Sequence, residues 1–226
     1  MLLDVLPRLR GVRLVLASSS PRRVEMLRGA GLAHLEVVPS NFAETLDKAG
    51  FASAAAYALA TARGKADEVL ARLEALAEAP AATDAQPPPP QRPLVLIACD
   101  TVVEAPTGEV LEKPRDRVDA ARMLRLLSGT PHRVHSGVVM LGRGGIELAR
   151  FAQTTVVEFG ALPESLILAH AASSEDDDKA GGYAIQGRAA SLVARVDGDV
   201  NCVIGLPLHR VCAELRAIAL ALAPAP

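Results

Sequence analysis

The sequence predicts an α/β protein built on a mixed sheet, and three observations lead to that class. Buried-strand patterns and amphipathic helical patterns follow one another along the chain, which is typical of α/β proteins. Some neighbouring strand patterns are separated only by short turn sequences, which indicates antiparallel hairpins in the same sheet. The 226 residues, of which 50% are apolar, are enough for one large domain or two small lobes.

The first three elements are expected to be a strand, a helix and a second strand. The apolar run Leu14–Ser18 predicts a short buried strand. Ser20 followed by Pro21 is typical of a helix start, and the apolar stripe that follows ends near Gly29. Leu35–Val38 predicts another short strand, which leads into a polar loop.

A long helix and a proline-rich segment are expected next. Ser53 is placed to cap a helix that runs to about Glu78 with one apolar face. Residues 79–93 are rich in proline and have no periodicity, so we expect an inserted surface loop there. The continuous apolar run Leu94–Cys99 then predicts a buried strand that ends at Asp100.

The remaining elements continue the mixed pattern. Val102–Glu104 and Val110–Glu112 flank a Pro-Thr-Gly turn and predict a hairpin. Asp116 is placed to cap a helix that extends through Leu127. The later elements are expected to be strands at Arg133–Leu141 and Ile146–Phe159, a helix at Pro163–Ala171, a solvated acidic stretch at Ser174–Asp178, strands at Tyr183–Gln186 and Ser191–Val196, and a final helix opened by Pro207.

Composition excludes several functional classes. The net charge of −2 and the pI of about 6.2 argue against a general attraction to nucleic acid or membranes, but they allow a local basic pocket. Cys99, Cys202 and Cys212 form no CxxC pair and lie among apolar residues, which favours core packing in a reducing compartment. The sequence shows no secretory signal and no run of 18 apolar residues. We therefore expect a cytoplasmic protein that binds neither nucleic acid nor membrane.

The segment Ala17–Arg23, with the sequence ASSSPRR, joins the first strand to the first helix. A helix N-terminus carries free backbone N–H groups and a partial positive charge, which suit a phosphate. The hydroxyl of Ser18 and its serine neighbours add donors, and Arg22 and Arg23 can bind phosphate oxygens as bidentate forks. An ordinary capped helix with two solvated arginines explains the same residues, so the segment by itself leaves both interpretations open.

Asp100 follows a buried strand, and the carboxyl edge of a sheet is where α/β proteins place ligands. A carboxylate there can hold a divalent metal or orient a water. A capping or turn aspartate is the alternative.

The chain has only four lysines, at positions 48, 65, 113 and 179, against 20 arginines. Lysine is a compact charge and arginine a planar fork, so lysine in such a chain suggests positions that need it. Pro114 keeps Lys113 extended and so fixes the direction of its side chain. Each lysine taken alone is also explained as a surface residue.

Gln186 is a candidate for recognising a base. It offers one acceptor and two donors, which match the N3–H and carbonyl oxygens of uracil or thymine. A strand-terminal glutamine at a bulge is the alternative. His132 and His135 point to opposite faces of a predicted strand, so we expect no zinc site, and the serines lack the partners of a catalytic triad.

Several motifs follow one another in order between Leu14 and Leu215. They are LASSSPRRVEML, a Ser-Asn-Phe-Ala-Glu run ending at Glu44, Lys65-Ala66, ACDTVV at 98–103, LEKPRD at 111–116, LLSGTPHRVHSGV at 126–138, DKAGGYAIQG at 178–187 and GLPL at 205–208. One such motif is weak, whereas the whole series in this order is specific. Together the motifs resemble the Maf family of nucleoside triphosphate pyrophosphatases.

The resemblance implies an elongated mixed sheet flanked by helices, with two lobes around a central cleft, as in Maf and inosine triphosphatase-like proteins. It implies a single domain over residues 10–222, which often forms homodimers. Members of the family cleave a nucleoside triphosphate between its α and β phosphates and release a monophosphate and pyrophosphate. They require a divalent cation, so we expect Mg²⁺, Mn²⁺ or Co²⁺.

By resemblance, Asp100 is the catalytic residue that accepts a proton from the attacking water, and Glu44 is its acidic partner in holding the metal. Ser18 belongs to the substrate-binding loop. The positions that match the phosphate-side basic residues of the family are Arg22, Arg23, Lys65 and Lys113.

Two short motifs resemble the branch of the family that acts on dTTP and UTP, and modified pyrimidine nucleotides are further expected substrates. The two motifs are EKP at 112–114 and IQG at 185–187. The specificity positions in that branch correspond here to Arg22, Thr101 and Gln186. Two alternatives stay open: a 7-methyl-GTP pyrophosphatase of the sister branch, and a nucleotide-binding regulator of cell division without turnover.

The chain departs from the family pattern at three places. Gly64 stands where the family often has glutamate, and Arg188 with two alanines replaces a glycine-containing run after Gly187. The sequence NCVIG at 201–205 differs slightly from the usual NVVG. None of these departures removes a proposed catalytic group.

Overall fold

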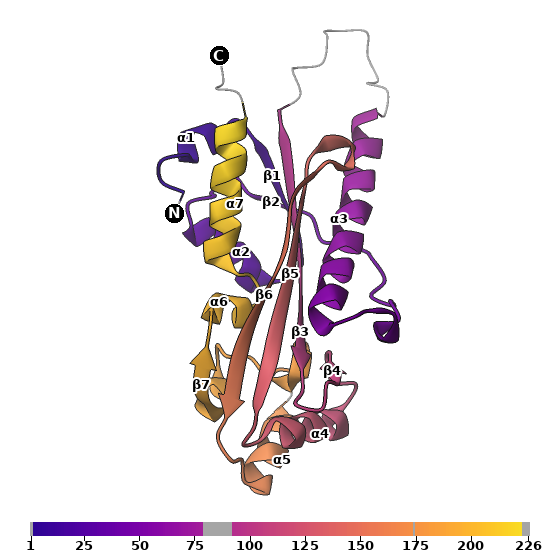
Figure 1. The fold of residues 1–226 in the computed structure, drawn as a ribbon, viewed down its shortest axis with the longest axis vertical. Coiled ribbons are helices and arrows are strands. Elements are labelled where there is room, and N and C mark those ends of the chain that lie inside the picture. Colours follow the sequence, from indigo (N-terminus) through magenta and orange to yellow (C-terminus); the bar gives the residue numbers. More distant parts are fainter. Residues whose placement is uncertain (1, 79–91, 174, 223–226) are drawn as a thin grey trace.

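The computed structural model describes residues 2–78, 92–173 and 175–222. The predicted inserted loop at 79–93 lies outside these residues except for its last two positions. A seven-stranded sheet runs through the molecule in the order β2-β1-β3-β5-β6-β7, and β4 also pairs with β3 (Figure 1). The strands are β1 Arg13–Ala17, β2 Glu36–Val37, β3 Leu94–Glu104, β4 Val110–Leu111, β5 Pro131–Leu141, β6 Glu147–Phe159 and β7 Val193–Asp197.

The sheet is mixed, as the sequence predicts. β1 is parallel to β2 and β3, whereas β3, β5, β6 and β7 pair antiparallel in succession. The predicted helices are present with small shifts at their ends, and two further short helices, α1 and α6, were not expected. The helices are α1 Leu6–Leu9, α2 Pro21–Gly29, α3 Ala54–Glu78, α4 Arg117–Leu127, α5 Glu164–Ser173, α6 Val200–Ile204 and α7 Leu208–Ala221. In the described part of the chain, no helix combines the length and apolar character needed to cross a membrane.

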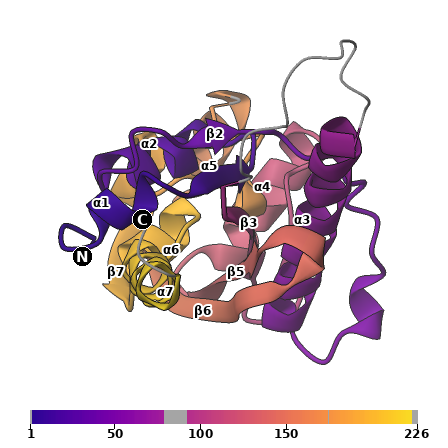
Figure 2. The same ribbon diagram turned by 90° about the horizontal axis from the view of Figure 1, so that it is seen from above.

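In the upper part of the molecule as drawn in Figure 1, helices cover both faces of the sheet. α3 lies on one face, and α1, α2 and α7 lie on the other (Figure 2). On the α3 side, Ala62 and Ala66 pack against Leu96, and on the α7 side Val211 and Leu215 belong to the same core as strand residues of the opposite face. This alternation along β1 and β3 is what strands buried on both faces require.

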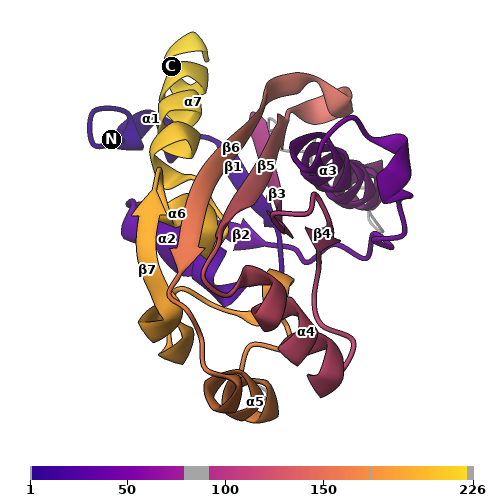
Figure 3. The ribbon, with the colours of Figure 1, turned by 60° about the horizontal axis from the view of Figure 1, so that its bottom comes forward.

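A second lobe surrounds the lower ends of β3, β5 and β6. α4 and α5 pack there against the strands (Figure 3). Its core has its own set of buried side chains, among them Leu111, Leu124, Val134, Phe159 and Tyr183. The two-lobed arrangement expected from the sequence is therefore present.

One edge of β3 is open in its middle. β1 pairs with β3 only as far as Ala98, and β4 begins to pair at Val103. β5 occupies the opposite edge throughout, from Leu96 to Glu104. Within the described residues, Cys99–Val102 therefore have no strand neighbour on the β1 side.

This arrangement corrects the expectation that Asp100 ends its strand. β3 continues for four residues beyond Asp100, because β5 supplies a continuous antiparallel partner. Asp100 nevertheless lies just past the end of the parallel β1–β3 pair. Asp100 therefore lies where the parallel pairing ends, although its own strand continues to Glu104.

Two predictions are wrong for the described residues 175–186. The predicted strand Tyr183–Gln186 is absent, because the chain turns at Gly181 and Gly182, which have φ values of 74° and 70°. The acidic stretch is also not uniformly solvated, because Asp176 is buried beside His170. Both differences arise because this segment packs into the lower lobe rather than extending along the sheet.

Gly137 sets the distance between α3 and the sheet. It pairs with Asp100 across the β3–β5 ladder and so lies on the same face. A Cβ atom at Gly137 would lie 2.6 Å from the backbone carbon of Ala58 and 2.6 Å from the backbone nitrogen of Leu59. The backbone of α3 thus contacts the strand directly, which brings the helix close to Asp100.

The substitution Gly137→Ala is expected to destabilise the protein, because the backbone of α3 cannot yield as a flexible side chain can. The expected loss is about 2 kcal/mol in the free energy of unfolding, typical of overpacking. Urea denaturation of the variant measures it. Gly160→Ala is the matched control, because no atom lies within 4 Å of the added Cβ. Equal stability of the two variants would contradict the direct contact.

Candidate active site

A pocket of about 650 Å³ lies beside the open edge of β3. Seven segments contribute to its wall: the loop between β1 and α2, the loop before α3, α3 itself, the middle of β3, and the turns around positions 113, 179 and 205. The charged residues that line it are Arg22, Arg23, Glu44, Lys65, Asp100, Glu112, Lys113, Asp178 and Lys179. The predicted substrate-binding residues Ser18 and Thr101 line it as well.

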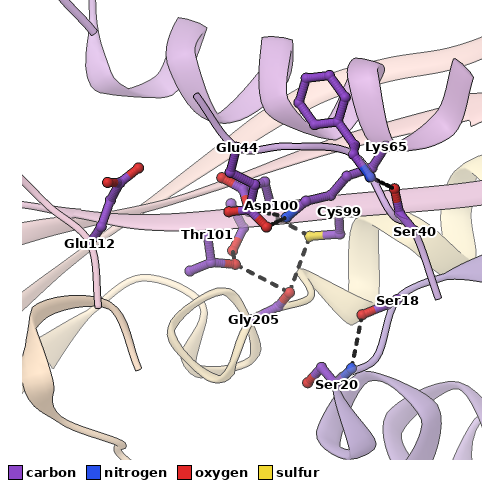
Figure 4. A network of polar contacts seen from close by, with 12 residues as sticks. Ser18, Ser20, Ser40, Glu44, Lys65, Cys99, Asp100, Thr101, Glu112 and Gly205 are labelled. Atoms are coloured by element: carbon purple, nitrogen blue, oxygen red, sulfur yellow. Dashed lines mark hydrogen bonds and ion pairs between the residues drawn. The ribbon is translucent and has the colours of Figure 1, made fainter. Parts of the chain in front are cut away.

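The loop before α2 turns the N-terminus of the helix toward the pocket. Ser20 stands at the N-cap position and Pro21 at the first helical position, as predicted, but the side chain of Ser20 makes no capping hydrogen bond. Instead, the backbone N–H of Ser20 donates to the hydroxyl of Ser18 at 3.1 Å (Figure 4). The backbone donors of the first helical turn and the partial positive charge there suit an anion.

Arg23 ties this loop to the open edge of β3. Its Nη1 donates to the carbonyl oxygen of Cys99 at 2.8 Å and to the Ser18 hydroxyl at 3.3 Å. Its Nε donates to the carbonyl oxygen of Gly205 at 2.7 Å, and its Nη2 donates to the Thr101 hydroxyl at 3.1 Å. The guanidinium therefore takes the place of a strand neighbour beside Cys99–Val102.

The sequence cannot distinguish Arg23 from Arg22, but the structure gives them different surroundings. A guanidinium has five N–H donors, and four contacts of Arg23 are made within the protein. Arg22 lines the pocket and makes no ion pair with the residues that the structure describes. Arg22 is therefore the better placed of the two to bind a ligand, while Arg23 holds the wall in position.

Lys65 joins the two predicted metal-binding carboxylates. Its Nζ lies 2.7 Å from Oδ1 of Asp100 and 2.9 Å from Oε1 of Glu44 (Figure 4). The side chains of Lys65 and Asp100 are only 12% and 10% exposed, whereas that of Glu44 is 44% exposed. Because solvent screens such a pair weakly, the two carboxylates together favour a positive charge between them.

Glu44 and Asp100 fit a divalent cation. Both are oxygen donors, which Mg²⁺ and Mn²⁺ prefer, and both already converge on the Lys65 ammonium. No group of three or more His, Cys, Asp or Glu side chains with metal-binding spacing occurs in the described part of the chain. The protein would thus supply two carboxylates, and phosphates and water the other ligands, as is usual for magnesium.

Thr101 faces the side of the sheet opposite to Asp100. Its hydroxyl lies 2.8 Å from that of Ser136 and accepts from Arg23. Gly205, whose carbonyl oxygen closes this cluster, has a φ of 125°, which strongly favours glycine. Thr101 is therefore held in a hydrogen-bonded position next to the pocket.

Glu112 adds a third carboxylate to the pocket wall. Tyr57 donates to it at 2.6 Å and Lys48 pairs with it at 2.8 Å. Burial alone raises the pKa of Glu112, but the hydrogen bonds from Lys48 and Tyr57 outweigh it, so the pKa lies below its ordinary value. Glu112 is therefore ionised at neutral pH.

The structure brings most of the predicted site residues together, with one exception. Gln186 is exposed and is not among the residues that line the pocket. Its proposed contact with a base stays a prediction. Sequence reasoning gave no role to several other lining residues, among them Ser40, Phe42, Glu112, Asp178, Tyr183 and Gly205.

Lys179 is a lining residue that the sequence hinted at without assigning. It pairs with Asp178 and lies next to the turn at Ala180–Gly182. The scarcity of lysine and its place in the DKAGG motif were the available signals. Lys113, by comparison, is exposed at the pocket and makes no ion pair with the described residues.

The fold and the pocket define an α/β protein with a charged pocket, in which a helix N-terminus and basic side chains lie beside converging carboxylates. The chain belongs to the Maf-like protein family, whose model matches residues 13–218.

Curated relatives cover nearly the whole chain. A human protein named probable bifunctional dTTP/UTP pyrophosphatase/methyltransferase is 42% identical over 220 residues, which are 95% of this chain but only 33% of the human protein. The dTTP/UTP pyrophosphatase of Methylobacillus flagellatus is 37% identical over 90% of this chain and 92% of its own length. The enzyme of that name from an Anaeromyxobacter species is 41% identical over 90% of this chain and 88% of its own length.

The substitution Arg23→Lys is expected to lower stability, because an ammonium cannot reproduce four separate contacts of a planar fork. A loss of about 2 kcal/mol is expected, since the two hydrogen bonds to the buried carbonyl oxygens of Cys99 and Gly205 are disrupted. Thermal unfolding followed by circular dichroism measures it. Arg28→Lys on the exposed side of the same helix is the control. If both variants unfold at the same temperature, Arg23 does not stabilise the open edge of β3.

Proposed function

We propose that this chain hydrolyses dTTP and UTP, and modified pyrimidine nucleotides, to the nucleoside monophosphate and pyrophosphate. The observation that carries the proposal is the pairing of two features in one pocket. A helix N-terminus and several basic side chains line the pocket beside the open edge of β3, and the Asp100 carboxylate lies on that edge. The names and coverage of the Methylobacillus and Anaeromyxobacter relatives support the same activity.

The charges in the pocket suit a triphosphate. A nucleoside triphosphate carries about four negative charges near neutral pH, so its binding requires concentrated positive charge. The N-terminus of α2, Arg22 and Lys113 are the groups that we assign to the phosphates. The Ser18 hydroxyl accepts two hydrogen bonds within the protein, and its own proton is available to a phosphate oxygen.

Glu44 and Asp100 would hold the divalent cation, with Mg²⁺, Mn²⁺ and Co²⁺ as candidates. A bound cation would neutralise phosphate charge and make the phosphorus more open to attack. Lys65 balances the two carboxylates in the free protein and is placed to contact a phosphate oxygen near them.

Asp100 is assigned the proton transfer. Its Oδ1 is held by Lys65, and its Oδ2 makes no hydrogen bond with the described residues. This second oxygen can orient a water and accept its proton as the water oxygen bonds to the α-phosphorus. The bond to the bridging oxygen breaks, and pyrophosphate leaves with its charge balanced by the basic side chains.

Base recognition is assigned to the Thr101 side of the pocket. The hydroxyl network of Thr101 and Ser136 fixes polar groups there, and Arg22 lies near enough to line the same space. Gln186 remains our candidate for reading the Watson–Crick edge of a pyrimidine. Because Gln186 is exposed outside the pocket, this assignment requires its turn to approach the nucleotide.

A homodimer is likewise a prediction that follows from the family.

A screen for pyrophosphate release tests the proposed activity. The purified chain would be assayed with dTTP, UTP, 5-methyl-UTP, CTP, dATP, GTP and 7-methyl-GTP, each with Mg²⁺, Mn²⁺ or Co²⁺. Release from dTTP and UTP in preference to the purine nucleotides is expected. Release from 7-methyl-GTP alone would contradict the substrate assignment, and nucleotide binding without release would favour a regulator.

Substitution Asp100→Asn tests the assigned proton acceptor. The amide keeps the shape of the side chain but cannot accept the proton, so turnover of dTTP is expected to fall by about 10³-fold or more. Steady-state kinetics measure the loss, and Asp197→Asn, at the exposed end of β7, is the control. Retention of a tenth of the wild-type rate by Asp100→Asn would refute the role.

A further inference from the structure

Gly64 lies in the interior of α3, where glycine is unfavourable. A glycine within a helix costs about 1 kcal/mol relative to alanine. The neighbourhood explains its presence, because a Cβ at Gly64 would lie 2.4, 2.5 and 2.8 Å from three ring carbons of Phe42. The ring of Phe42 therefore occupies the space that any other side chain at position 64 would need.

Phe42 belongs to the loop that carries Glu44. Residues 38–47 of this loop form neither helix nor strand, so no backbone ladder fixes the position of Glu44. The Glu44 side chain is 44% exposed, and it pairs with Lys65, which Asp100 also binds. The placement of Glu44 must therefore depend on how its loop is attached to α3.

The loop is also attached to α3 just before Phe42. Glu68, one turn beyond Gly64, accepts from the Ser40 hydroxyl at 2.9 Å and from the backbone N–H of Asn41 at 2.9 Å. The backbone N–H of Phe42 donates to the Ser40 hydroxyl at 3.0 Å. The ring contact at Gly64 is thus the last attachment before the chain reaches Glu44.

We propose that Phe42 and Gly64 form a clamp that positions Glu44 for the divalent cation. This inference rests on the proposed function, because it assigns Glu44 to the cation. Phe42 and Gly64 are positioning residues: neither supplies a metal ligand. The tip of the ring can reach the helix only because position 64 has no side chain, and docking the ring limits the motion of the carboxylate two residues later.

Mn²⁺ binding to the full chain tests the clamp. Titration with MnCl₂ followed by electron paramagnetic resonance measures the affinity without any turnover. The substitutions Gly64→Ala and Phe42→Ala are each expected to weaken Mn²⁺ binding by about tenfold, as is usual when the support of a ligand is lost. Gly29→Ala, a helical glycine with no atom within 4 Å of the added Cβ, is the matched control and should bind as wild type.

The double variant separates the clamp from a general effect on the helix. Without the ring there is nothing for the new methyl group to overlap, so Gly64→Ala should cause no further loss in the Phe42→Ala background. If Gly64→Ala fails to fold, Phe42→Ala carries the test, because it removes a contact and creates no overlap.

Three results would overturn the clamp. They are wild-type Mn²⁺ affinity in Gly64→Ala or in Phe42→Ala, an equal further loss in the double variant, and a wild-type chain that releases pyrophosphate but binds no Mn²⁺. Failure of the proposed function has a different signature, which is intact Mn²⁺ binding without pyrophosphate release from any triphosphate.

Discussion

The open edge of β3 is the constraint on which the site depends. β1 stops at Ala98 and β4 starts at Val103, while β5 keeps the strand extended between them. An extended strand with one free edge presents backbone groups that need partners and side chains on both faces. Asp100 faces α3 from this stretch, and Thr101 faces the α6 side. A single interruption in the sheet thus brings the carboxylate, the hydroxyl and the pocket together.

Arg23 and Lys65 both donate hydrogen bonds to residues of this open edge, but to different kinds of group. Arg23 fills it as a hydrogen-bond donor to the main chain, so it links α2, β3 and the turn at Gly205 into one wall. Lys65 reaches it from α3, which lies close because Gly137 allows the helix backbone to touch β5. Arg23 therefore has a supporting role, and the same geometry leaves Arg22 free to face the pocket. The different roles of Arg22 and Arg23 therefore follow from their positions and not from residue type.

Much of the fold was predictable, because its signals are local. Apolar runs and caps such as Ser53 and Asp116 gave the strands and helices. The ordered motifs gave the residues that line the pocket. The extension of β3 past Asp100 was not predictable, because it depends on pairing with a distant strand. The turn before Tyr183 was also missed, since an apolar stretch packed into a lobe has the same pattern as a strand. Likewise, only the contacts in the folded structure distinguish the role of Arg22 from that of Arg23. They also explain why a glycine occupies position 64.

The open edge of β3 is where we expect the triphosphate and its cation to bind. A crystal structure with the non-hydrolysable α,β-imido analogue of dTTP and Mn²⁺ tests it most directly, with anomalous scattering to locate the metal. We expect phosphates against the segment from Ser18 to Arg22 and Mn²⁺ bonded to the carboxylates of Glu44 and Asp100. An ordered nucleotide bound elsewhere, or a Mn²⁺ ion bonded to neither carboxylate, would contradict it.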